Sequence, residues 1–180
     1  GQISSLSLVT GHTQTTQGNG FIALRDGLLT DSAKKVYGDA EDSSLLSAEL
    51  IALDDESLAA YADAAGASLQ DINDPSSPGA ILINYGQSYY SLSDDEVTKI
   101  SGDILNVKKG DTLSFCTDPE NQDDNAALAI GAVTSERPMG TMIQGMANVT
   151  LVVSKDVFHA LESSISSFTP ESTYQASYIT

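Results

Sequence analysis

The side chains that most often carry out catalysis or bind metals are scarce in this chain. Its 180 residues include two histidines, His12 and His159, and one cysteine, Cys116. These three residues cannot form a four-ligand zinc site without carboxylates from elsewhere. His12 lies among Gly, Thr and Gln residues that indicate a loop, and His159 follows Phe158 in an amphipathic helical pattern. We therefore expect His159 at a solvent edge or satisfied in the core, not acting as a ligand or base.

Cys116 ends an apolar run, and this position favours a small buried hydrophobe over a reactive thiol. A single cysteine also excludes an internal disulfide. The sequence contains no G-x-S-x-G elbow, no P-loop and no strand followed by G-x-G-x-x-G. We predict no catalytic residue, no metal ligand, no cofactor and no enzymatic activity.

Carboxylates occur in adjacent pairs, at Asp54/Asp55, Asp94/Asp95 and Asp123/Asp124. In such an acidic chain these pairs are typical of helix starts and turns, and they are weak evidence for acid/base chemistry. The acidic stretch Asp118 to Asn125 could suggest calcium, but a loop starting at Asp118 has Asp at position six, where an EF-hand has Gly. It also lacks Glu at position twelve. We expect a solvated acidic turn, with a structural metal at Asp118 to Asp124 as the alternative.

All three methionines, Met139, Met142 and Met146, fall within eight residues, in a stretch that follows Pro138 and contains Gly140 and Gly145. One interpretation is that they fill a gap in the core, as Met often does. The other is a mobile, partly exposed loop whose thioethers contact a peptide, a lipid-bearing substrate or a partner protein. On the second interpretation Arg137, Pro138, Met139, Met142 and Met146 form the contact site.

The apolar pattern predicts a mixed α/β (α+β) single domain with a mixed sheet and a few short helices. Strands are predicted at Ser4–Thr10, Ala48–Leu53, Ala80–Tyr85, Ala126–Val133, Val149–Val153 and Tyr174–Ile179. Helices are predicted after N-caps at Thr30 to Ser32, at Asp54 or Asp55, and at Ser154, with a shorter piece at Asp94–Thr98.

The connections are predicted from turn residues and from spacing. We expect a loop or hairpin tip at Gly11–Gly20, an acidic linker at Asp39–Ser44, and a hairpin in which Ile104–Val107 and Thr112–Phe115 flank a turn. The helix that begins near Asp54 should end at Gly66 and pack Leu58 and Tyr61 on the sheet. Strand, helix and strand over this region have the size of a right-handed crossover, with an antiparallel return as the alternative.

Four motifs in order give a resemblance to a known family. They are Leu53-Asp54-Asp55 at a strand end, Pro78–Asn84 (PGAILIN), Val107–Leu113 (VKKGDTL) and Pro138–Gly140 (P-x-G). Together they resemble the extracytoplasmic domain of FtsX/MacB-like ABC transporter permeases over residues 45–160. The resemblance implies a periplasmic-core-domain-like fold, transmembrane helices before residue 2 and after residue 180, and a separate cytoplasmic ATPase. It also implies roles in antimicrobial-peptide resistance or export, lipoprotein or peptide export, or control of cell-wall hydrolases.

Net charge limits the possible partners. With 25 acidic against 8 basic residues the formal charge is −17, which disfavours nucleic acid and anionic membrane surfaces because both require clustered Lys and Arg. The charge either attracts a cationic partner at low salt or serves only to keep the domain soluble. No run approaches the roughly 20 apolar residues of a membrane span.

We interpret Gly1 as a tag-cleavage scar and residues 2–180 as one domain on the extracytoplasmic side of a cell membrane. The expected function is non-catalytic: coupling membrane-helix motion to export of, or resistance to, a peptide or lipid-bearing substrate, or to a cell-envelope partner. A secreted or surface-anchored binding module is the alternative, since the polar Ser/Thr-rich ends and the acidic balance suit it equally.

Overall fold

The computed structural model describes residues 10–39, 44–86, 92–93, 96–97, 102–141, 147–168 and 172–179. The helices in these ranges are α1 Asp31–Tyr37, α2 Asp55–Ala65, α3 Leu69–Ile72 and α4 Lys155–Ser164. The longer strands are β1 Thr10–Ala23, β2 Leu45–Leu53, β3 Gly79–Ile83, β8 Thr112–Cys116, β9 Asn125–Thr134, β10 Val149–Ser154 and β11 Ser172–Ile179. The short strands are β4 Tyr85–Gly86, β5 Leu92–Ser93, β6 Glu96–Val97 and β7 Gly102–Asp103.

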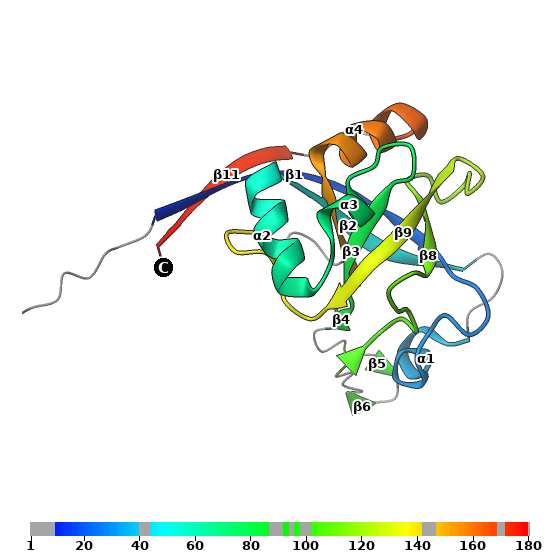
Figure 1. Cartoon of the computed structure of the whole chain (residues 1–180). Helices are drawn as coiled ribbons and strands as arrows, with labels where there is room; N and C mark the ends of the chain where they lie inside the picture. Colours follow the sequence, from blue (N-terminus) through cyan, green and yellow to red (C-terminus); the bar gives the residue numbers. More distant parts are fainter. Residues whose placement is uncertain are drawn as a thin grey trace, which may run out of the picture.

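Six strands close into a barrel in the order β1-β2-β10-β3-β9-β8, with helices around it (Figure 1). Closure comes from the pairing of β1 with β8, at Phe21 with Cys116 and at Ile22 with Phe115. The pairs β2–β10 and β3–β9 are parallel and the other neighbours are antiparallel. The mixed sheet, short helices and single domain predicted from sequence are confirmed, whereas closure of the sheet into a barrel was not predicted.

The first half of β1 leaves the barrel as a two-stranded ribbon with β11 (Figure 1). The antiparallel register runs from Thr10 opposite Ile179 to Gln17 opposite Ser172. Because β1 then continues along β2 to Ala23, one strand belongs to both the ribbon and the barrel. The predicted final strand at Tyr174–Ile179 is confirmed.

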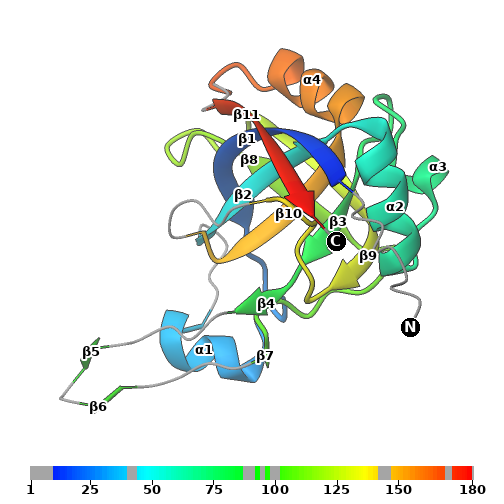
Figure 2. The ribbon, with the colours of Figure 1, turned by 90° about the vertical axis from the view of Figure 1, so that its left-hand side faces the viewer.

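The barrel interior is filled by alternate residues of each strand, as the two-residue period of a strand requires. Leu50 and Ala52 of β2, Leu151 of β10 and Leu82 of β3 belong to this core. α4 covers one end of the barrel and α1 lies at the other (Figure 2). Phe158 of α4 and Phe168 pack edge to face, with ring centroids 5.1 Å apart, and both belong to the same core.

A second apolar layer lies on the outer wall of the barrel, beneath α2 and α3. The remaining strand positions point into this layer, including Ile51 and Leu53 of β2 and Val152 of β10. Leu58 and Ala62 of α2 and Ile72 of α3 cover them and are fully buried. Packing of β2 on both faces explains why its sequence is a nearly continuous apolar run.

Helix starts follow the predicted caps. The side chains of Thr30, Asp54 and Ser154 accept hydrogen bonds from the backbone N–H groups of Ala33, Ser57 and Val157, respectively. Each bond satisfies one of the free N–H groups of a first helical turn. Gly66 ends α2 in the left-handed conformation, with φ 76°, as predicted.

The predicted loop at Gly11–Gly20 was wrong, because this stretch, including His12, forms part of β1. At position 20 the strand needs a glycine because another strand packs closely against it, and not because the chain turns. A Cβ atom at Gly20 would lie 2.5 Å from the carbonyl oxygen of Cys116 and from Phe115 Cζ. Glycine inside a strand commonly marks such a close approach of another segment.

Two further local predictions were wrong. Glu96–Val97, placed within a short helix, pairs instead with Leu92–Ser93 as a small antiparallel hairpin. Ile104–Val107 does not form a hairpin with β8, since Leu105 bridges to Leu29 and the Asn84 side chain bonds the backbone of Ile104 and Leu105. The turn itself is present, with Asp111 N–H donating to Lys108 and Gly110 at φ 94°.

β2 and β3 run in opposite directions, because β10 lies between them, parallel to β2 and antiparallel to β3. The right-handed crossover expected between them is therefore wrong, and the antiparallel return is correct. The predicted strand over residues 4–9 and most of the predicted linker at residues 39–44 lie outside the described residues. Within the described part of the chain, none of the helices has the length and apolar character needed to cross a bilayer.

Candidate functional site

The candidate site lies on the outer wall of the barrel, where α2 faces the segment that follows β9. Asp54 caps α2 so that Leu58 and Ala62 point into the outer apolar layer. Tyr61 occupies the adjoining face and is only half-buried. Its hydroxyl donates a 2.7 Å hydrogen bond to the carbonyl oxygen of Glu136, which ties the helix to the segment opposite.

That segment, residues 135–141, turns back over the barrel by local hydrogen bonds. The Thr134 hydroxyl accepts from the Glu136 N–H at 3.1 Å, and the Thr141 hydroxyl donates to the Pro138 carbonyl at 2.7 Å. Gly140, at φ 76°, supplies the left-handed conformation that this turn requires. We call this segment, together with Thr134 at the end of β9, the crossing segment (residues 134–141).

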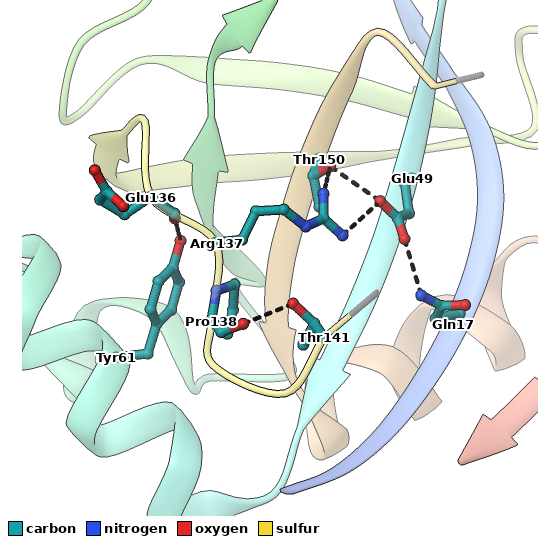
Figure 3. Close-up of polar contacts among 8 residues, drawn as sticks. All are labelled: Gln17, Glu49, Tyr61, Glu136, Arg137, Pro138, Thr141 and Thr150. Carbon is teal, nitrogen blue, oxygen red and sulfur yellow. Dashed lines mark hydrogen bonds and ion pairs between the residues drawn. The ribbon is translucent and has the colours of Figure 1, made fainter. Parts of the chain in front are cut away.

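A buried ion pair anchors the crossing segment to the barrel (Figure 3). Arg137 Nη2 lies 3.1 Å from Glu49 Oε2, and Arg137 Nη1 donates to the Thr150 hydroxyl at 3.1 Å. Thr150 and the Gln17 amide also donate to the Glu49 carboxylate, at 3.1 and 2.9 Å. The Glu49 side chain is only 3% exposed. A carboxylate this buried needs such partners, since an uncompensated buried charge is very unfavourable.

Sequence reasoning missed Glu49 as part of this site. In the sequence, Glu49 is the single charged residue within the apolar run Ala48–Leu53. Glu49 alternates with the interior residues Ala48 and Leu50 and so points to the outer wall. The sequence did contain one signal for this pair. A glutamate inside a strand that is apolar on both faces will be buried, and a buried carboxylate needs a cation from elsewhere in the chain.

An apolar cavity of about 270 Å³ lies between α2 and the crossing segment. It is lined by Ser57, Ala60, Tyr61, Ala64, Ala65, Thr134, Glu136, Arg137, Pro138 and Met139. The alanines of α2 form one wall because their small side chains leave the space open. Met139, whose side chain is 55% exposed, forms part of the opposite wall. Among the described residues, Met139 is the one large hydrophobic residue that is exposed to solvent.

The structure brings together three of the five predicted contact residues. Arg137, Pro138 and Met139 all line the cavity. The interpretation of Met139 as a core residue is wrong, because its side chain is exposed. Met142 and Met146 lie outside the described residues. Tyr61, predicted only to pack on the sheet, is the residue that joins the two walls.

Two hydroxyl groups that line the cavity, those of Ser57 and Tyr61, already form hydrogen bonds within the protein. The Ser57 hydroxyl donates to Asp54 Oδ2 at 3.1 Å and so takes part in the helix cap. Burial is the main cause that raises the pKa of Tyr61 above its usual range, so this hydroxyl stays a neutral donor. The arrangement suits binding of an apolar group better than bond-making chemistry.

The other sequence candidates lie elsewhere in the molecule. His159 is exposed on α4, near Glu162, and Cys116 is buried. In the acidic loop, Asp118 accepts from the Glu120 N–H, and Asp124 accepts from the N–H and hydroxyl of Ser166. The described residues contain no group of three or more His, Cys, Asp or Glu side chains suited to hold a metal.

Comparisons of this chain with family models, with curated proteins and with solved structures found no match.

Proposed function

We propose that this chain is the non-catalytic extracytoplasmic domain of an ABC-type permease. The observation that carries the proposal is the antiparallel pairing of its first and last described strands, with Thr10 opposite Ile179. A domain inserted between two membrane helices has to receive and return the chain at neighbouring points. Strands β1 and β11 supply that geometry at one end of the ribbon (Figure 1).

The same ribbon offers a route for mechanical coupling. β1 carries the ribbon at its start and closes the barrel with β8 near its end, at Phe21 and Ile22. A displacement of the ribbon would therefore act directly on the barrel through continuous backbone hydrogen bonds. In the proposed permease, membrane-helix motion driven by a cytoplasmic ATPase would reach the outer cavity by this path.

The four motifs that carry the resemblance to permease domains also support the proposal, because each occupies a strand or a connection between elements. Leu53-Asp54-Asp55 forms the junction of β2 and α2, and Pro78–Asn84 covers β3. Val107–Leu113 contains the turn before β8, and Pro138–Gly140 is the turn of the crossing segment. All four motifs thus lie in strands or in strand connections of one barrel.

The decisive experiment is to determine the genomic sequence on both sides of the coding region. An apolar segment of about 20 residues on each side, with an ATPase gene adjacent, is the expected result. A signal peptide with a wall-anchor motif would instead support the second candidate, a secreted or surface-anchored binding module. The cavity between α2 and the crossing segment favours that candidate equally, because it suits binding in either setting.

A further inference from the structure

We propose that the cavity between α2 and the crossing segment docks a partner protein that inserts one apolar side chain from a basic surface. The proposal adds a ligand class to the candidate site. It rests on the proposed function only in placing the partner at the cell envelope, since the docking itself belongs to this chain.

The size of the cavity suits a single apolar side chain. Pockets that enclose small-molecule ligands usually measure roughly 300–1,000 Å³. At about 270 Å³, this cavity lies just below that range. An apolar anchor residue, held by a larger surface around it, is the occupant that interfaces place in such a hollow.

The walls around the anchor are apolar and one of them is adaptable. Ala60, Ala64 and Pro138 offer few polar groups, and Met139 adds a flexible thioether at the exposed side. A methionine can adjust to the shape of an inserted ring or branched chain. The Arg137–Glu49 and Tyr61–Glu136 contacts meanwhile fix the backbone of both walls before a partner arrives, which lowers the ordering cost of binding.

The charge around the cavity selects a basic partner. Arg137 is the one cation in the lining, and its charge is compensated by the buried Glu49. The Glu136 carboxylate points away from both Tyr61 and Arg137 (Figure 3) and forms no ion pair with any described residue. The uncompensated charge in the cavity lining is therefore the negative charge of Glu136, in a chain of formal charge −17, and a basic surface is attracted to it.

The test uses a synthetic acetylated peptide in which one phenylalanine is flanked on each side by a Lys-Gly-Lys segment. The peptide is titrated into the 15N-labelled 180-residue chain at low salt. We expect amide shifts confined to α2 and the crossing segment that saturate by about 1 mM peptide. Replacing the phenylalanine by glycine should weaken binding about tenfold or more, and replacing the lysines by glutamates should abolish it.

A matched pair of variants tests the location. Ala60→Leu fills the cavity, whereas Ala59→Leu adds the same side chain at an exposed position of the same helix that does not line it. Both changes keep good helix formers. Ala60→Leu should reduce affinity about tenfold or more, and Ala59→Leu should leave it unchanged.

A second pair tests the charge. Glu136→Gln should weaken binding about threefold at low salt, as expected for one exposed charge, and should reduce the salt dependence. Glu120→Gln, in the distant acidic loop, is the control for a loss of net charge alone.

Three outcomes would overturn the proposal. The first is the absence of binding at millimolar peptide. The second is equal binding of the phenylalanine and glycine peptides, which would indicate a general acidic surface. The third is binding that Ala60→Leu does not weaken. Because every measurement uses this chain alone, failure here leaves the permease proposal standing, and a wall-anchor motif in the gene would leave the docking site standing.

Discussion

Arg137 and Glu49 are 88 positions apart in the chain, yet their Nη2 and Oε2 atoms lie 3.1 Å apart on the outer wall of the barrel. This ion pair fixes the crossing segment against β2 and β10. It thereby sets the position of one wall of the cavity, where Pro138 and Met139 lie. Its strength decides whether the candidate site is preformed.

Arg137→Ala should lower the free energy of unfolding by roughly 3 kcal/mol, because it leaves the buried Glu49 carboxylate without its cation. Urea denaturation measures this loss. Lys109→Ala is the control, since Lys109 pairs with Asp71 at 3.7 Å with both side chains about half exposed, and its removal should cost less than about 1 kcal/mol. Equal losses for the two variants would show that the Glu49 contact is not a strong anchor.

Leu58→Ala should destabilise the domain by about 2–5 kcal/mol, because Leu58 is fully buried in the layer between α2 and the barrel. Leu69→Ala, at a partly buried position of α3, should cost clearly less. Denaturation curves for wild type and Leu58→Ala that superimpose would contradict the packing of this helix.

Gly20→Ala should destabilise by about 2 kcal/mol or more, since the new Cβ would meet backbone and ring atoms of β8 at 2.5 Å. Gly18→Ala is the matched control on the same strand, where the nearest atom is the ring edge of Phe168 at 3.0 Å. That ring can move more readily than a paired backbone. A larger loss for Gly18→Ala would show that closure of the barrel by β1 and β8 is placed wrongly.

Burial first, and then the negative charges of Asp118 and Asp124, raise the pKa of Cys116 above its usual range. The thiolate is therefore disfavoured in the folded state. Stability from this group is complete below the unfolded pKa of about 8.5 and is lost as pH rises through the higher folded value. Wild type should accordingly lose more stability than Cys116→Ala between pH 8 and pH 9.5.

Urea midpoints of both proteins across that interval measure the effect. Staying below pH 10 avoids the ionisation of Tyr61, whose pKa is also raised by burial and whose own contribution would be lost only above about pH 10. Parallel pH profiles for wild type and Cys116→Ala would contradict the assignment.

Local signals in the sequence predicted the elements that depend on neighbours in the chain. The caps at Thr30, Asp54 and Ser154 and the glycine after α2 form hydrogen bonds within a few residues, so their meaning does not depend on the rest of the fold. The continuous apolar strands were predicted for the same reason, because burial on both faces leaves a pattern in the strand itself. Arg137, Pro138 and Met139 were identified because Met and turn residues cluster there.

Tertiary structure alone decided which strands pair and what faces the outer wall. Closure between β1 and β8 depends on Gly20 meeting Cys116 and Phe115, and the local sequence around Gly20 is equally typical of a loop. The Glu49–Arg137 pair likewise forms only when β2 and the crossing segment are brought together by β10. Contacts between residues this far apart leave no periodicity in the chain. They form only in the completed barrel, where packing offsets the entropy lost in closing the long loop between the two residues. The sequence by itself therefore determined most of the helices and strands and identified the residues of the crossing segment. The tertiary structure decided that α2 lies opposite this segment and that the charge of Arg137 is compensated by Glu49.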